Sequence, residues 1–121
     1  MRAGLLLMVK MNLPINQHSD DFKEWLSKNM NLSDRARNDC FSRCRRVERD
    51  LKINIRDYLT SKQSYRELLV KVKKYSEEKS SSKSSQHILK VTLRGAIKKY
   101  AIYSYPENSQ IYDQFDYKKV G

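Results

Sequence analysis

The chain has 121 residues, enough for one domain with a modest core and too few for a two-domain enzyme. Its 39% hydrophobic content supports folding, but three Gly and two Pro are too few for the turns of an all-β protein. With 25 Lys and Arg against 14 Asp and Glu, the formal net charge is +11. We therefore expect one helical domain that attracts polyanions, first nucleic acid and then acidic proteins or membranes.

The spacing of the cysteines and the hydropathy of the chain indicate the cellular compartment in which the protein is expected. Cys40 and Cys44 lie four apart in a segment with helical periodicity, which points both thiols the same way and disfavours a strain-free disulfide. The run Leu5 to Val9 is shorter than the apolar core of a signal peptide, and no other stretch approaches the length of a membrane span. We expect a soluble, cytoplasmic protein with reduced, shielded thiols and no membrane partner.

The first elements follow an N-terminal arm over residues 1–18. Ser19, followed by two aspartates, predicts the start of a short helix over 19–30, with Phe22 and Leu26 on its inner face. Ser33 and Asp34 predict the cap of a second helix, in which apolar residues recur at intervals of three and four. This buried stripe comprises Ala36, Cys40, Cys44, Val47 and Leu51.

Two further helices are predicted downstream. Residues 53–60 lose the helical phase and indicate a connector with one helical turn, after which Ser61 or Ser64 opens a third helix that ends by about residue 77. The polar stretch 76–85 indicates a mobile loop whose serines cap a fourth helix, from about 84 to 104. We expect residues 19–104 to form an all-α four-helix bundle, followed by a tail over 105–121 that docks or stays loose.

The second helix carries the clearest functional pattern. Placing residues every 100° leaves four arginines and two small polar residues opposite the buried stripe, namely Arg35, Asn38, Ser42, Arg45, Arg46 and Arg49. The planar fork of arginine suits phosphate oxygens or the edge of guanine, and asparagine can contact adenine with two hydrogen bonds. The pattern predicts a helix face that contacts DNA; a merely solvated face is the alternative.

The fourth helix repeats the basic pattern without an acidic residue. One side carries Lys83, Gln86, His87, Lys90, Arg94 and Lys98, opposite an inward face that includes Leu89, Leu93 and Tyr100. Lysines contact phosphates more often than bases, so we expect a salt-dependent clamp on the DNA backbone. Substitutions on either face should leave stability almost unchanged. Most of the aromatic residues fall at core positions, which favours packing over base stacking.

Three stretches together resemble the core-binding (SAM-like) domain of tyrosine recombinases, the phage integrases. They are Phe22 to Leu26 in the first helix, Leu32 to Asn38 at the start of the second, and Ser85 to Tyr100 in the fourth, and the likeness covers about residues 19–104. The resemblance implies that the domain grips double-stranded DNA during integration or recombination, with the second and fourth helices against the major groove. By matched position it places Arg35, Asn38, Arg45, Lys90 and Arg94 at the duplex.

The resemblance does not extend to the catalytic domain of the recombinases. The family's catalytic domain would need further arginines, a lysine, a His-x-x-Arg element and a tyrosine nucleophile, and too few residues follow Tyr105 to supply it. His87 and Lys90 share the spacing of that element only by coincidence, and Tyr112 and Tyr117 are expected to pack or to lie in the tail. The cysteines and histidines match no zinc spacing, and no phosphate-binding or dinucleotide motif is present. We expect neither an enzyme nor a metal or cofactor site.

Two hypotheses follow from the sequence. The first is a non-catalytic module that binds double-stranded DNA mainly through its phosphates, either a free-standing relative of the core-binding domain or the remnant of an integrase. The second is a helical interaction or adaptor domain whose basic surface binds an acidic protein partner.

Overall fold

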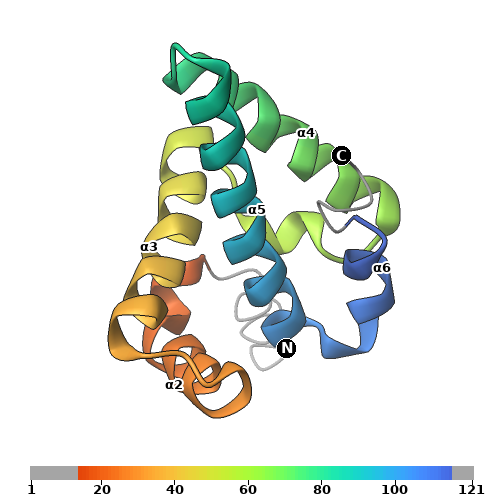
Figure 1. The fold of residues 1–121 in the computed structure, drawn as a ribbon. Coiled ribbons are helices and arrows are strands. Elements are labelled where there is room, and N and C mark those ends of the chain that lie inside the picture. Colours follow the sequence, from red (N-terminus) through yellow and green to blue (C-terminus); the bar gives the residue numbers. More distant parts are fainter. Residues whose placement is uncertain (1–13, 116–121) are drawn as a thin grey trace.

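The computed structural model describes residues 14–115, in which every regular element is helical (Figure 1). The fold is therefore all-α. In chain order the elements are η1 (Ile15–His18), α2 (Ser19–Met30), α3 (Asp34–Leu51), η2 (Ile55–Tyr58), α4 (Lys62–Lys79), α5 (Lys83–Ser104), η3 (Pro106–Asn108) and α6 (Ser109–Asp113). No helix within 14–115 is both long enough and apolar enough to cross a bilayer.

Serine caps set the start of the three long helices. The hydroxyls of Ser33, Ser61 and Ser82 each accept a hydrogen bond from the backbone N–H three residues on, which satisfies a donor that the helix itself leaves free. The predicted ranges 19–30 and 84–104 match α2 and α5 closely. The predicted cap at Ser19 is wrong, because η1 runs directly into α2 and makes Ser19 its first residue.

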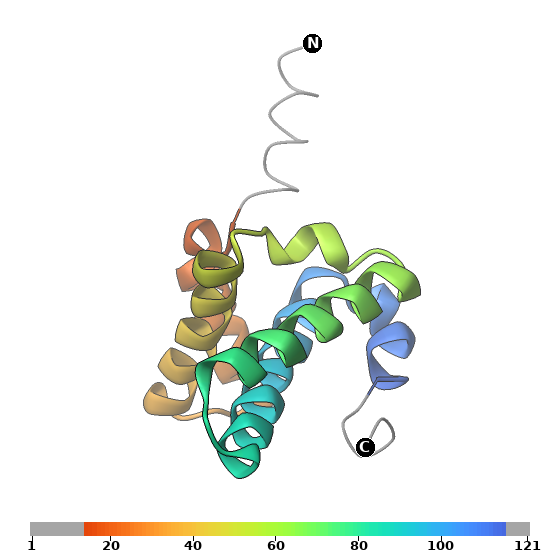
Figure 2. The same cartoon turned by 90° about the horizontal axis from the view of Figure 1, so that it is seen from above.

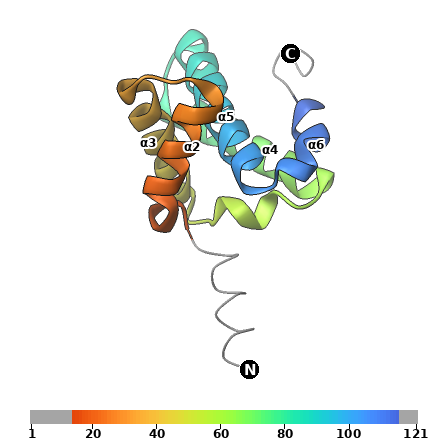
Figure 3. The same cartoon turned by 90° about the horizontal axis from the view of Figure 1, so that it is seen from below.

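α5 lies at the centre of the molecule. It packs against α3 on one side and α4 on the other, while α2 and α6 contact it towards its C-terminal end (Figures 1 and 3). The core that these helices share includes Leu26, Cys44, Val72 and Ile97, all fully buried. Aromatic rings close the α2 side, where the ring centroids of Phe22 and Tyr100 are 5.1 Å apart.

The segment expected to be a mobile loop is mostly helical. α4 continues to Lys79 and α5 starts at Lys83, so only Ser80 to Ser82 link the two helices (Figure 2). Two contacts explain why the polar stretch stays ordered. Buried Ser76 donates its hydroxyl to the Val72 carbonyl, and the amide of Gln86 donates to the carbonyls of Glu77 and Ser80. The bonds from Gln86 satisfy backbone carbonyl groups at the end of α4. Composition alone could not reveal these contacts.

Both ends of the described chain pack on the bundle. Ile15, which the sequence assigned to an N-terminal arm, is fully buried. The C-terminal segment docks through Tyr112, which is also fully buried and donates its hydroxyl to the Leu59 carbonyl at 2.6 Å. Residues 1–13 of the expected arm, and Tyr117 in the tail, lie outside the described residues.

The predicted connector and thiols are confirmed. The one helical turn expected between residues 53 and 60 is η2, whose Ile55 is fully buried. Cys40 and Cys44 are free and buried on the inner stripe of α3, as the spacing indicated.

Candidate nucleic-acid interface

The outer side of α3 presents the arginine-rich surface that the sequence predicts. We call this set the α3 face, and it consists of Arg35, Asn38, Ser42, Arg45, Arg46 and Arg49. All are exposed except Arg46, which is partly covered. The α3 face lies opposite the buried stripe of Cys40, Cys44 and Val47 because residues three and four apart share one side of a helix.

Of the four acidic residues of α3, Glu48 and Asp39 are directed away from this surface, and Asp34 is engaged by Arg37. Glu48 turns towards the core, where its two carboxylate oxygens accept hydrogen bonds from the N–H groups of Ile15 and Ile55, each at 2.9 Å. Asp34 forms an ion pair with Arg37, and Asp39 lines a hollow between α3 and α5. These carboxylates therefore do little to offset the charge of the α3 face.

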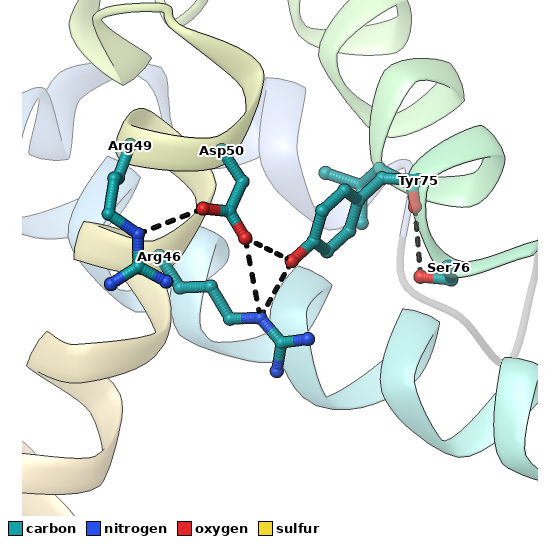
Figure 4. A network of polar contacts seen from close by, with 6 residues as sticks. Arg46, Arg49, Asp50, Tyr75 and Ser76 are labelled. Atoms are coloured by element: carbon teal, nitrogen blue, oxygen red, sulfur yellow. Dashed lines mark hydrogen bonds and ion pairs between the residues drawn. The ribbon is translucent and has the colours of Figure 1, made fainter. Parts of the chain in front are cut away.

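Asp50 contacts the α3 face and positions two of its arginines (Figure 4). One of its oxygens accepts a hydrogen bond from Nε of Arg49 at 2.8 Å, and the other accepts from the Tyr75 hydroxyl at 2.5 Å. Nε of Arg46 in turn donates to the Tyr75 oxygen at 2.7 Å. The bond from Arg49, with that from Tyr75, lowers the pKa of Asp50 to about 2.

This network holds the guanidinium groups of Arg46 and Arg49 in an orientation suited to binding phosphate. The contacts drawn for Arg46 and Arg49 use Nε, while the terminal nitrogens of both guanidinium groups point away from Asp50 and Tyr75 (Figure 4). The two terminal N–H₂ groups form the planar fork that binds phosphate oxygens in pairs. Fixing Nε in advance reduces the side-chain entropy that binding would otherwise cost.

Tyr75 also connects the α3 face to α4. The Arg46 guanidinium carbon lies 5.4 Å from the centre of the Tyr75 ring, and Nζ of Lys79 lies 5.7 Å from it. Cations at this distance are attracted to the face of an aromatic ring. The basic surface therefore continues from α3 to the last turn of α4, next to the link with α5.

The predicted basic face of α5 is not a continuous exposed surface. Arg94 is partly buried and donates from Nη2 to the Leu69 carbonyl of α4 at 2.8 Å. Lys98 forms an ion pair with Asp113 of α6 at 3.0 Å, and Gln86 caps the end of α4. This is a correction: α5 is central, so its predicted outer side packs against α4 and α6.

A smaller basic cluster remains where α4 and α5 meet. We call it the hairpin cluster, and it surrounds a hollow of about 120 Å³ with Lys73, Lys83, His87 and Lys90, together with Glu77. Partial burial lowers the pKa of Lys90, and the charges of Arg94 and Lys73 lower it further. Cations held this close repel one another, and an anion would relieve the repulsion.

Lys73 is the residue of this cluster that the sequence analysis missed. The three-residue link makes α4 and α5 antiparallel, so residues at similar distances from it, offset by one, face each other: Glu77 with Gln86, and Leu69 with Arg94. The same rule pairs Lys73 with Lys90. A short link, had it been recognised, would have indicated this pair.

Comparisons of this chain with models of protein families, with curated proteins and with solved structures each found no match. The resemblance to the core-binding domain of tyrosine recombinases therefore rests on the residues of this chain alone.

Proposed function

We propose that the protein is a non-catalytic domain that binds double-stranded DNA, with the α3 face in the major groove and the hairpin cluster against the phosphate backbone. The observation that carries this proposal is the exposed α3 face, in which arginine forks alternate with Asn38 and Ser42. The carboxylates of Asp34, Glu48 and Asp50 are engaged by other groups of the chain. A major groove admits one α-helix, and Arg and Asn are the side chains best suited to its base edges.

The placement of the remaining basic residues refines the proposal. The α5 contact expected from the sequence reduces to Lys83, His87 and Lys90, because Arg94 and Lys98 bind protein groups. The ring contacts of Tyr75 extend the α3 face to Lys79 of α4, and the hairpin cluster supplies a second group of cations between α4 and α5. On the sequence resemblance alone, we propose that the chain is related to the core-binding domain of tyrosine recombinases.

A fluorescence-anisotropy titration tests the proposal. Wild-type protein is titrated into labelled duplexes of about 20 base pairs at two salt concentrations, with polyglutamate as a non-nucleic polyanion. We expect tighter binding to the duplexes than to polyglutamate, and a slope of log K against log salt of about −0.9 for each phosphate contacted. Lys90→Ala should weaken binding to every duplex and reduce the steepness of that slope by about one unit.

A pair of charge-matched double variants locates the surface. Arg35→Ala with Arg45→Ala removes two cations from the α3 face, whereas Arg66→Ala with Lys74→Ala removes two exposed cations from α4. We expect only the first pair to lose about 1–3 kcal/mol per residue on a preferred sequence, and Asn38→Ala to flatten that preference. The absence of salt-dependent duplex binding, equal losses from both pairs, or equally tight polyglutamate binding would refute the proposal.

A further inference from the structure

The side of α5 that does face solvent is largely apolar. We call it the α5 apolar face, and its residues follow helical spacing: Ile88, Val91, Thr92, Gly95, Lys99 and Ile102. Ile88 is 61% exposed, and the others are partly exposed. Since a helix rises 1.5 Å per residue, this face extends for about 21 Å along α5. Contiguous apolar surface of this kind typically marks an interaction site.

Two hollows flank the middle of the α5 apolar face. One, of about 410 Å³, lies towards α4 and α6 and has Leu69, Ile102 and Phe115 in its wall. The other, of about 340 Å³, lies between α3 and α5 and has Leu32 and Ala36 in its wall. Gly95 and Val91 line both hollows. Apolar side chains from outside could therefore enter on either side of Gly95.

Gly95 itself has no role in the packing of the described chain. It lies in the interior of a 22-residue helix, where glycine destabilises by about 0.5–1 kcal/mol relative to alanine. A Cβ atom placed on Gly95 would meet no heavy atom within 4 Å. No neighbour in residues 14–115 therefore requires the absence of a side chain, whereas a helix crossing from outside would approach more closely over glycine.

The charges around the hollows indicate the chemistry of the occupant. Arg43 and Lys99 line the hollow next to α3, and Lys98 and Lys99 line the other. The acidic residues there are Asp39, one turn from Arg43 on the same helix, and Asp113, which Lys98 already engages. The surplus is positive, so acidic side chains would complement the rim.

The same charges disfavour two other occupants of these hollows, a second copy of the chain and the chain's own C-terminal segment. A second copy of the chain would also carry a net charge of +11, and its cations would face those of the rim. The residues after Phe115 contain two lysines and one aspartate, so their surplus charge is positive and also fails to complement the rim.

We propose that the α5 apolar face docks an acidic amphipathic helix of a partner protein. The partner helix crosses α5 over Gly95, places apolar side chains at i and i+3 or i+4 in the two hollows, and directs carboxylates towards Arg43, Lys98 and Lys99. This mode is the recognition of an amphipathic helix by an apolar groove. The α5 apolar face is separate from the α3 face, because the α3 face lies on a different side of α3 from Arg43.

Titration of full-length ¹⁵N-labelled protein with a synthetic helical peptide tests the proposal. The probe is a peptide of about 18 residues with leucines along one face and glutamates elsewhere, matched with a peptide in which lysines replace the glutamates. We expect the acidic peptide to shift the amide signals of residues 88–102 and the basic peptide to leave them unchanged. A 20-base-pair duplex bound to the α3 face should not displace the acidic peptide.

Three variants check the geometry. Gly95→Leu fills the crossing point and should weaken peptide binding at least about tenfold, and Arg43→Glu with Lys99→Glu should do the same through charge. Gly95→Ala should raise the melting temperature, which shows that position 95 tolerates a side chain in the free protein. Lys74→Glu with Lys71→Glu, on exposed positions of α4, serves as the charge control.

Several outcomes would overturn the proposal. Equal binding of the basic peptide, or peptide shifts confined to residues outside both 88–102 and the walls of the two hollows, would remove the acidic helix as the occupant. A concentration-dependent dimer in sedimentation, abolished by Gly95→Leu, would assign the surface to a second copy. Changes in the signals of residues 88–102 on substituting Tyr117 and Val120, without peptide, would assign it to the chain's own C-terminal segment. Loss of DNA binding alone would leave this proposal standing and refute only the proposed function.

Discussion

Glu48 joins α3 to two short elements, one of which lies 33 residues away in sequence. Its carboxylate lies on α3 and accepts the backbone N–H groups of Ile15 and Ile55, at the starts of η1 and η2. Burial raises the pKa of Glu48, while these two donors act to lower it. One side chain therefore satisfies the first N–H group of two short elements that pack on α3.

Replacing Glu48 should be costly for stability. Glu48→Ala leaves two partly buried N–H groups without an acceptor, and we expect a loss of about 2–4 kcal/mol in the free energy of unfolding. Glu48→Gln keeps one carbonyl oxygen and should lose about half of that. Urea unfolding measures both, with exposed Glu67→Ala as the control, which should stay within about 0.5 kcal/mol of wild type. Equal effects of Glu48→Ala and Glu67→Ala would contradict this role.

The hydrogen bonds to the Asp50 carboxylate should make the free energy of unfolding depend on pH in the acid range. Its pKa falls from the usual 3.8 to about 2 in the folded state, so the unfolded chain binds a proton first as the pH drops. The stabilisation from the carboxylate is present above about pH 4 and is lost between about pH 4 and pH 2. Asp50→Asn should remove this difference, and Tyr75→Phe should raise the pKa of Asp50. Side-chain NMR titration and urea unfolding at several pH values provide the measurements; an Asp50 pKa near 3.8 would refute the account.

At the level of elements, the pairing of α4 with α5 decides which basic residues are available for binding. Arg94 belongs to this pairing, because its guanidinium group is half-buried and donates to Leu69 across the two helices. Burial lowers the pKa of Arg94, and its Nε has no hydrogen-bond partner among residues 14–115. The residue therefore serves the contact between helices, and we expect its loss to lower stability, in contrast to the expectation from the sequence.

Substitutions of Arg94 and Arg45 should differ in their effect on the free energy of unfolding. We expect Arg94→Met to lower the free energy of unfolding by about 1.5–3 kcal/mol through the lost charged hydrogen bond, while the methionine retains the apolar stem. Arg45→Ala, at an exposed position, should change it by less than about 0.5 kcal/mol. Thermal and urea unfolding of the two variants make the comparison. A stable Arg94→Met would show that the Leu69 contact is dispensable.

Local signals in the sequence were sufficient to predict the helices but insufficient to predict which sides of α5 other helices cover. Serine caps and apolar stripes define α3 and α5 because both act within a few residues. The α3 face was predictable because α3 is packed on its inner side and open on its outer side. A helical wheel cannot show that α5 has neighbours on several sides, which covers Arg94 and leaves Ile88 exposed. The ordered turns at 76–79 also depend on contacts beyond composition.

At the scale of the whole molecule, the C-terminal segment completes the core. Tyr112 is fully buried, its ring centroid lies 4.8 Å from that of Tyr65, and its hydroxyl bonds to Leu59, which precedes α4. The short helix α6 therefore fastens the end of the described chain to the start of α4. The sequence left open whether this tail docks, because its aromatic residues follow no regular period.

Tyr112 should be the residue that holds this segment in place. Tyr112→Phe removes only the buried hydroxyl and leaves the Leu59 carbonyl without that donor, so we expect a loss of about 1–2 kcal/mol. Tyr112→Ala removes the ring as well and should lose about 3–5 kcal/mol. Amide hydrogen exchange over 109–113 and urea unfolding measure the effect, with Tyr105→Phe as the control. Unchanged exchange in Tyr112→Ala would mean that α6 docks by other contacts.

The three-residue link between α4 and α5 bears on the order in which the chain folds. Closing so short a loop costs little chain entropy, so this helical pair can form from neighbouring segments. The ties of Ile15 to Glu48 and of Tyr112 to Leu59 join residues 33 and 53 apart and require the intervening helices to be in place. We therefore expect the two ends to assemble last and to open first. A partly open molecule would retain the α4 and α5 pair while releasing η1 and α6.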